Sequence, residues 1–289
     1  MITDTHAHLF WESFKADLEE VLKRSAEAKV TGIINVGVDV NTSQIALDQL
    51  PSLPNLTAYS SIGIHPHEAV IYAENPEASI QIAIQELEKI YLSNPEKVVA
   101  VGECGLDYLI HANDIHPDIP LGIEETKALQ RKLFQAQIEL AKRLNLPLLI
   151  HCRDDRSQNP ENCEAWDEVL ELASSHFGVL HCYSGKSLTT QKALKTNFYF
   201  SFAGNLTYPK NEYLREAVKI IPLEKILVET DCPFLPPQTH RGMRNEPSFI
   251  TAIVETIAQI KNEPITTVQK ALSQNFQKLL ARKQNTNTV

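Results

Sequence analysis

The feature that most constrains the fold of this chain is a regular alternation of short apolar runs with longer amphipathic stretches. The runs are rich in β-branched and other apolar residues, and they occupy positions 2–8, 32–38, 57–65, 97–103, 147–151, 179–182, 197–202 and 225–231. Stretches with helical periodicity separate them, most clearly 123–144, where Leu129, Leu133 and Leu140 fall on one face. Alternation of strands and helices along a whole chain predicts a parallel sheet.

The length of the chain decides between the two architectures open to such a sheet. The chain has 289 residues, and eight strand-helix units at this size favour a closed barrel, typically of about 250 residues, over an open doubly wound sheet. No linker, low-complexity tract or block of like charge marks a domain boundary. We therefore predict an α/β protein with a single (β/α)8 TIM-barrel domain over 1–282 and a polar tail over 283–289.

Histidines and carboxylates recur at the predicted carboxyl ends of five of the strands. The residues that share this placement are His6, His8, Glu103, His151, His181 and Asp231. The carboxyl ends of barrel strands form one rim, where catalytic residues from different strands meet. A lone histidine in a strand is more often a hydrogen-bonded structural group, but this joint pattern suits Zn, Mn, Fe or, with more oxygen, Mg. We therefore predict a metal site at the rim.

The cysteines indicate a reduced protein. There are five of them, an odd number without C-x-x-C spacing, which disfavours a disulfide framework or a zinc ribbon. Four directly follow a candidate ligand, and in extended backbone they would point away from the ligands toward the helices: Cys104, Cys152, Cys182 and Cys232. Thiolate ligation or nucleophilic catalysis is the competing interpretation. With no signal sequence and no apolar run of about 18 residues, we expect a cytoplasmic protein without membrane association.

Charge and missing motifs narrow the function further. Lys and Arg total 27 and Asp and Glu total 36, for a net charge of −9, which argues against a basic surface that coats nucleic acid. Nucleic acid held locally at a site remains compatible, because bound cations add positive charge there. The chain has no phosphate loop, dinucleotide fingerprint or Gly-x-Ser-x-Gly elbow, so we expect neither a nucleotide cofactor nor a Ser-His-Asp triad.

Seven motifs follow one another along nearly the whole chain: DTHAHL at 4–9, GIHPH at 63–67, GECGLDY at 102–108, HCRD at 151–154, HCYSG at 181–185, ETDCPFL at 229–235 and RGMRNEP at 241–247. Together they resemble the TatD family of metal-dependent hydrolases, within the amidohydrolase-like group of barrels. The resemblance implies two divalent ions, of Mg, Mn or Zn, and a phosphodiesterase activity on DNA, commonly 3′ to 5′ exonucleolytic.

The resemblance also implies how the candidate ligands divide. His6, His8 and Asp231 would hold one ion, His151 and His181 the other, and Glu103 would bridge them. From its place at the site, Asp231 is the candidate to accept a proton from the attacking water.

Five further residues are candidate substrate contacts: His65, Arg153, Ser184, Glu229 and Arg244. Arginine suits phosphate oxygens because it binds them bidentately. The structural alternatives are a helix cap or loop-fixing bond for His65 and surface salt bridges for the two arginines. Glu229 has a second candidate role, the orientation of a metal ligand, and its structural alternative is a buried ion pair.

Two stretches depart from the family pattern, 109–122 and 155–164, and both fall on the predicted active-site side. His111 and His116 in the first are most simply loop surface residues. The leading hypothesis is a nuclease acting on single-stranded or frayed 3′ ends of DNA. The alternatives are a D-aminoacyl-tRNA deacylase or another metal-dependent ester or amide hydrolase, and a binding protein with a structural metal in a closed shell. A monomer is compatible with each of them.

Overall fold

The computed structural model describes residues 2–52, 54–110 and 121–282, and their strands form one parallel sheet in which every strand pairs with the next along the chain. The strands are β1 (Ile2–Ala7), β2 (Val30–Val36), β3 (Thr57–Ile62), β4 (Val98–Asp107), β5 (Leu148–Arg153), β6 (Phe177–Leu180), β7 (Asn197–Phe202) and β8 (Ile226–Val228). The ring closes where Ala7 bridges Cys232 in parallel and the His8 amide donates to the Cys232 carbonyl at 2.9 Å. The predicted TIM barrel is confirmed.

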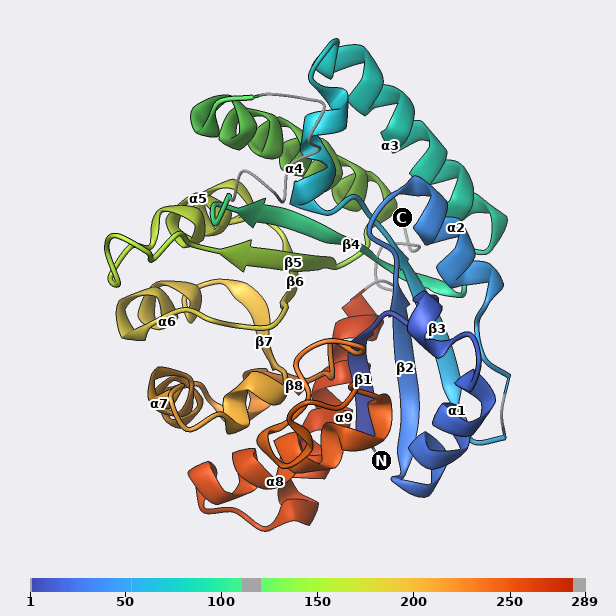
Figure 1. Cartoon of the computed structure of the whole chain (residues 1–289), viewed down its shortest axis with the longest axis vertical. Coiled ribbons are helices and arrows are strands. Elements are labelled where there is room, and N and C mark those ends of the chain that lie inside the picture. The colour runs from blue at the N-terminus through green and yellow to red at the C-terminus, as the bar shows by residue number, and fades with distance from the viewer. Residues whose placement is uncertain (1, 53, 111–120, 283–289) are drawn as a thin grey trace.

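Helices cover the outside of this ring (Figure 1). They are α1 (Leu18–Glu27), α2 (Val40–Asp48), α3 (Pro76–Ser93), α4 (Ile123–Leu144), α5 (Glu164–Leu172), α6 (Ser187–Ala193), α7 (Glu212–Ile220), α8 (Ile250–Lys261) and α9 (Ile265–Arg282). Short 3-10 helices lie between them: η1 (Glu12–Phe14), η2 (Pro66–Tyr72), η3 (Gly204–Thr207), η4 (Leu223–Lys225), η5 (Gln238–His240) and η6 (Pro247–Phe249).

Helix α4 has the bounds that its periodicity predicts. It buries Leu133, Phe134 and Ile138 against the sheet, and it ends at Asn145, whose φ of 50° is the left-handed conformation that asparagine tolerates at a helix end. Apolar spacing therefore sets which face of the helix packs, and the terminal asparagine sets where it stops.

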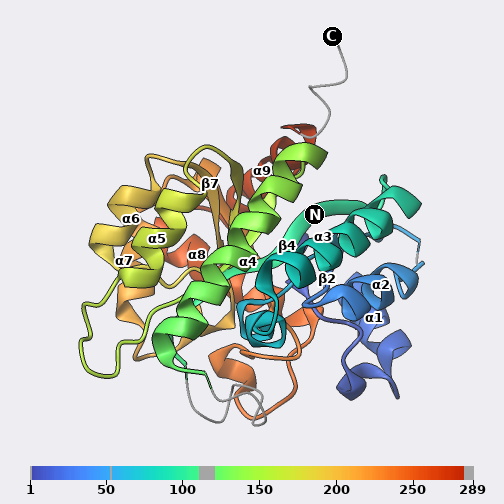
Figure 2. The ribbon, with the colours of Figure 1, turned by 90° about the horizontal axis from the view of Figure 1, so that it is seen from above.

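The two ends of the barrel are closed differently. At the amino ends of the strands, Val99, Leu149 and Leu227 pack in one buried cluster with Phe276 and Leu279 of α9. Figure 2 shows α9 at one end of the molecule and the segment that follows β8 at the opposite end. Because apolar side chains fill the amino end, the carboxyl rim of the strands is the end that can carry a site.

Strand bounds place the candidate ligands differently from the prediction. Strand β4 continues past Glu103 to Asp107, so Glu103 lies within the strand, whereas His181 and Asp231 follow the ends of β6 and β8. Residues 154–163 form irregular backbone ahead of α5. His111, His116 and the tail 283–289 lie outside the described residues.

Helix lengths and compositions also bear on membrane insertion. Within the part of the chain that the structure describes, no helix is both long and apolar enough to cross a membrane.

Candidate metal centre

The six candidate ligands converge at the carboxyl rim, as the strand pattern predicts. Five of them line a cavity of about 580 Å³: His8, Glu103, His151, His181 and Asp231. His6 lies directly beneath, with its side chain fully buried. Nitrogen and oxygen ligand atoms from β1, β4 and β5 and from the segments after β6 and β8 therefore share one small volume.

The first group of donors surrounds His8. Its Nε2 lies 3.2 Å from Nε2 of His6, 3.5 Å from Oδ1 of Asp231 and 3.7 Å from Oε2 of Glu103. On its other side, Nδ1 of His8 donates to the Val36 carbonyl at 2.8 Å, so in its neutral form the ring presents Nε2 as an acceptor. Carboxylate oxygens are acceptors too, and lone pairs that converge in this way fit a cation.

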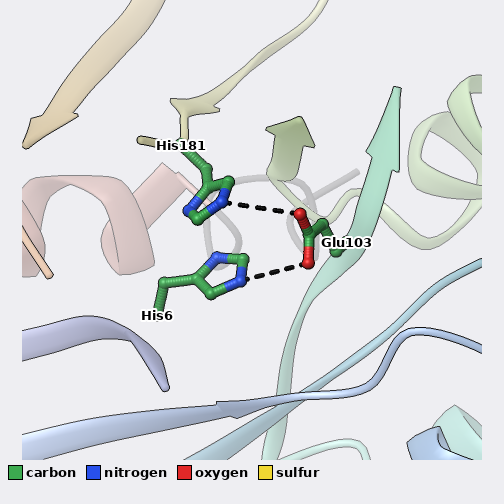
Figure 3. A group of neighbouring side chains, drawn as sticks. All are labelled: His6, Glu103 and His181. Atoms are coloured by element: carbon green, nitrogen blue, oxygen red, sulfur yellow. Dashed lines mark ion pairs between the residues drawn. The ribbon is translucent and has the colours of Figure 1, made fainter. Parts of the chain in front are cut away.

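Glu103 reaches two separate groups of imidazoles. Its Oε2 lies 3.3 Å from Nε2 of His6, while its Oε1 lies 3.5 Å from Nε2 of His181, as Figure 3 shows, and 3.0 Å from Nδ1 of His151. Burial opposes ionisation of this carboxyl, but the imidazoles of His65, His6 and His181 outweigh it and hold the Glu103 pKa well below its usual range. A buried, ionised carboxylate with one oxygen toward each group has the geometry that a bridging ligand needs.

Electrostatics at the histidines also favours a cation. Burial, together with the ring of His181, lowers the pKa of His6 to about 3, so this ring is neutral as a metal ligand must be. Burial opposes protonation of His151, but hydrogen bonds to Asp107 and Glu103 raise its pKa to about 9. Positive charge is thus stabilised between the carboxylates, a condition that a divalent cation also meets.

Among the residues that the structure describes, three triplets could hold a metal ion, each with donor atoms within 4.8 Å of one another. They are His6, Glu103 and His181; His6, His8 and Asp231; and His65, Asp107 and His151, and the first two share His6. The second triplet is the set that the family resemblance assigns to one ion, apart from the bridging Glu103. In the third, His151 meets Asp107, a residue that the sequence analysis missed.

Asp107 lies behind His151 and fixes its orientation. Its Oδ2 is 3.0 Å from Nε2 of His151 and 3.0 Å from Nε2 of His67, and its Oδ1 accepts from Nε of Arg153 at 3.0 Å. Both ring nitrogens of His151 face carboxylates, so the protonated ring donates Nε2–H to Asp107 and Nδ1–H to Oε1 of Glu103 at 3.0 Å. Carboxylates that hold a ligand histidine in this way raise its basicity.

Glu229 stands behind His181 in the same way, outside the residues that line the cavity. Its side chain has no exposed surface; Oε1 accepts from the Cys182 amide at 2.7 Å and lies 2.7 Å from Nδ1 of His181. Burial opposes protonation of His181, but the charges of Glu229 and Glu103 raise its pKa to about 10. The geometry is that of ligand orientation, the alternative raised from the sequence.

Asp4 is a further buried carboxyl that the sequence analysis left unassigned. It accepts from the Thr230 amide at 2.9 Å and from the Thr230 hydroxyl at 2.6 Å, which anchors the residue before Asp231. Burial raises the pKa of Asp4 to about 7. Its position two residues before His6, on the same strand face, is a signal that could have revealed this role.

Of the other predicted substrate contacts, His65, Arg153 and Ser184 line the cavity. His65 both caps η2, where its Nδ1 accepts from the His67 amide at 3.2 Å, and directs Nε2 to within 3.6 Å of Oε1 of Glu103. These three residues are therefore placed where a substrate could reach them.

Arg244 pairs with a carboxylate outside the cavity lining. Its two Nη atoms pair with the carboxylate of Asp17 at 2.8 and 2.7 Å, and it is absent from the cavity lining. The surface salt bridge, the alternative raised for this arginine, is what forms.

Two cysteines also depart from their predicted positions. Cys104 and Cys232 are buried in the core as expected, but Cys152 and Cys182 are among the residues that line the cavity, and Sγ of Cys182 accepts from Nδ2 of Asn205. The backbone of Cys182 has a φ of 41°, so the strand alternation behind the prediction does not extend to this residue.

A closed barrel with imidazoles and carboxylates gathered at its carboxyl rim defines the class of metal-dependent barrel hydrolases. The family model for TatD related DNase matches residues 3–281 of the chain. The chain therefore belongs to the TatD family of metal-dependent hydrolases, as its motifs indicate.

Individual relatives agree with this assignment. The chain is 36% identical over 284 residues to the uncharacterized metal-dependent hydrolase YabD of Bacillus subtilis, covering 96% of this chain and 98% of that protein. It is 30% identical over 265 residues to the 3′-5′ ssDNA/RNA exonuclease TatD of Salmonella typhimurium, covering 90% and 91%. The crystal structure of YJJV, a TatD homologue from Escherichia coli, superposes with a TM-score of 0.77 at 25% identity, covering 97% and 98%.

Proposed function

We propose that this protein is a two-metal exonuclease that removes nucleotides from the 3′ end of single-stranded or frayed DNA. The observation that carries the proposal is the placement of Glu103, whose two carboxylate oxygens face different histidine groups. In this proposal His6, His8 and Asp231 hold one divalent ion and His151 and His181 the other, with Glu103 shared between them. Two bound ions of Mg, Mn or Zn would acidify water and neutralise charge on phosphoryl oxygens.

The residues of the chain supply the remaining steps. Asp231 is partly exposed at the cavity, so its carboxylate can accept the proton of the attacking water. Arg153 lines the same cavity and keeps further N–H donors for a phosphate oxygen while its Nε donates to Asp107. His65 and Ser184 offer additional polar contacts to the phosphate at the cavity wall.

The substrate class rests on two kinds of support. A relative named as an exonuclease of single-stranded DNA and RNA covers 90% of the chain, and a cationic guanidinium stands beside the donor set, where a phosphodiester needs one. Hydrolysis of an ester in D-aminoacyl-tRNA would use the same donor set, and substrate comparison separates the two activities.

The test is degradation of end-labelled single-stranded oligonucleotides by protein stripped of metal and then supplied with Mg²⁺, Mn²⁺ or Zn²⁺. We expect a ladder that grows from the 3′ end, depends on added metal and disappears in Glu103→Gln. Glu255→Gln, an exposed carboxyl on α8, is the matched control and should leave the ladder unchanged. Absence of cleavage with every metal, together with release of D-amino acids from tRNA, would contradict the proposal.

A further inference from the structure

Two exposed aromatic side chains stand at the edge of the cavity. Trp11 directly precedes η1 and Phe234 follows β8, and their side chains are 36% and 47% exposed. Both line the cavity together with His8. Their ring centroids are 5.9 Å apart with the planes at 89°, so one ring presents its edge to the face of the other.

This exposure is unusual within the molecule. Apart from Trp11 and Phe234, the large hydrophobic side chains that are exposed in the described part of the chain have no aromatic ring; examples are Ile82, Leu92 and Leu188. The aromatic members of that set are these two, and both lie at the same cavity. Isolated exposed aliphatic residues need no explanation, whereas adjacent aromatic rings left in water beside a polar site indicate a ligand that covers them.

The aromatic pair lies beside His8, one of the proposed metal ligands. The ring centroid of His8 is 6.2 Å from that of Phe234 and 6.5 Å from that of Trp11. Arg153 belongs to β5, which lies across the ring of strands from β1 and β8. The cavity therefore has an aromatic wall on one side and a guanidinium on the other.

We propose that Trp11 and Phe234 form a stacking subsite for a nucleobase of the strand being cleaved. The inference rests on the proposed function and deepens it, because it names the part of the substrate that lies beside the scissile phosphate. A nucleotide joins a flat apolar base to an anionic phosphate, which matches the two walls. Stacking on aromatic faces tolerates every base, so the subsite would accept any sequence in a single strand.

The subsite would also favour unpaired 3′ ends of DNA over paired ones. In a duplex each base already stacks on its neighbours, and a terminal base must leave that stack before it can cover Trp11. The open position of the rings, at the edge of the cavity, suits a base that enters from outside better than a small side chain that needs an enclosed pocket.

Tryptophan fluorescence tests the subsite without relying on catalysis. The chain contains two tryptophans, and Trp166 is fully buried, so quenching by a bound base reports on Trp11. The probes are a hexathymidylate with phosphorothioate linkages, which resist cleavage, and an abasic strand of the same length and charge. We expect quenching by the thymidylate alone and, by anisotropy, about tenfold tighter binding of the thymidylate than of the abasic strand.

Variants complete the experiment. Trp11→Ala and Phe234→Ala should each weaken thymidylate binding by about tenfold and leave abasic binding unchanged, and Trp11→Phe should restore most of the affinity. Leu188→Ala, an exposed residue on α6 outside the cavity lining, is the matched control and should change neither. Equal binding of both strands without quenching, in a protein that still degrades DNA, would overturn the subsite and leave the proposed function standing. Failure to bind or cleave either strand would overturn both the subsite and the proposed function.

Discussion

The two ends of the barrel use opposite chemistry. At the amino end, Phe276 and Leu279 of α9 join the apolar interior of the sheet, and Nδ2 of Asn275 donates to the carbonyls of Leu223 and Ile226. At the carboxyl end, carboxylates and imidazoles such as Glu103 crowd into one buried volume. The first arrangement stabilises the fold by burial, whereas the second buries ionisable groups whose nitrogen and oxygen atoms can hold a cation. Stability and activity should therefore be separable by end.

The largest effect should come from the carboxyl end. Glu103→Gln removes the charge that faces both histidine groups, so we expect hydrolysis to fall by roughly 10³-fold or more, since metal ions contribute several kcal/mol to stabilising the transition state. The variant should still unfold cooperatively, because the apolar packing at the amino end is unchanged. Initial rates and thermal unfolding monitored by circular dichroism measure the two quantities. A stable fold that keeps wild-type activity would refute the comparison.

A substitution at the amino end should lower the stability of the fold and leave the metal site unchanged. Phe276 is almost fully buried, and Phe276→Ala should lower the free energy of unfolding by about 3–5 kcal/mol through lost burial and a cavity. Metal affinity of the folded fraction should stay the same. Chemical denaturation and calorimetric metal titration check both, and a large loss of metal affinity would show that the ends are coupled.

A smaller effect should follow from the carboxylate behind His151. Asp107→Asn removes the charged acceptor for Nε2 of His151, so metal affinity should fall by about 10–100-fold. Competition with a chelator measures the affinity, and Asp17→Asn, whose carboxylate pairs with Arg244 outside the cavity, is the control. Unchanged affinity in Asp107→Asn would mean that His151 needs no such partner.

The smallest effect should come from Arg244. Because it pairs with Asp17 and lies outside the cavity lining, Arg244→Ala should change kcat/KM by less than about twofold and cost about 1 kcal/mol of stability at most. Arg153→Ala, within the cavity, should reduce kcat/KM by tenfold or more if it holds a phosphate. Equal losses in both variants would argue that neither arginine acts through the cavity.

Most of the fold could be predicted because it depends on local periodicity. The bounds of β7 and α4 follow from runs that are apolar with a period of two or 3.6 residues. Glu103 was expected at a strand end, yet pairing with β5 carries β4 on to Asp107. That extension depends on a neighbouring strand and is invisible in the segment itself.

The candidate site was predictable as a set of ligand types, but not in its supporting contacts. Asp107 meets His151 and His67 only after three segments fold together, and no spacing along the chain encodes that meeting. Glu229 and Arg244 were expected at the substrate because of their charge and their motifs. In the structure the first is buried behind His181 and the second pairs with Asp17, contacts that depend on other segments of the chain.

The central claim is that the carboxylate of Glu103 lies between two cations. Anomalous diffraction at the manganese edge, from crystals grown with Mn²⁺, tests it directly. The account predicts two peaks that flank Glu103, one beside His6, His8 and Asp231 and the other beside His151 and His181. A single peak, or a peak held by His65, Asp107 and His151 in place of the second, would contradict it.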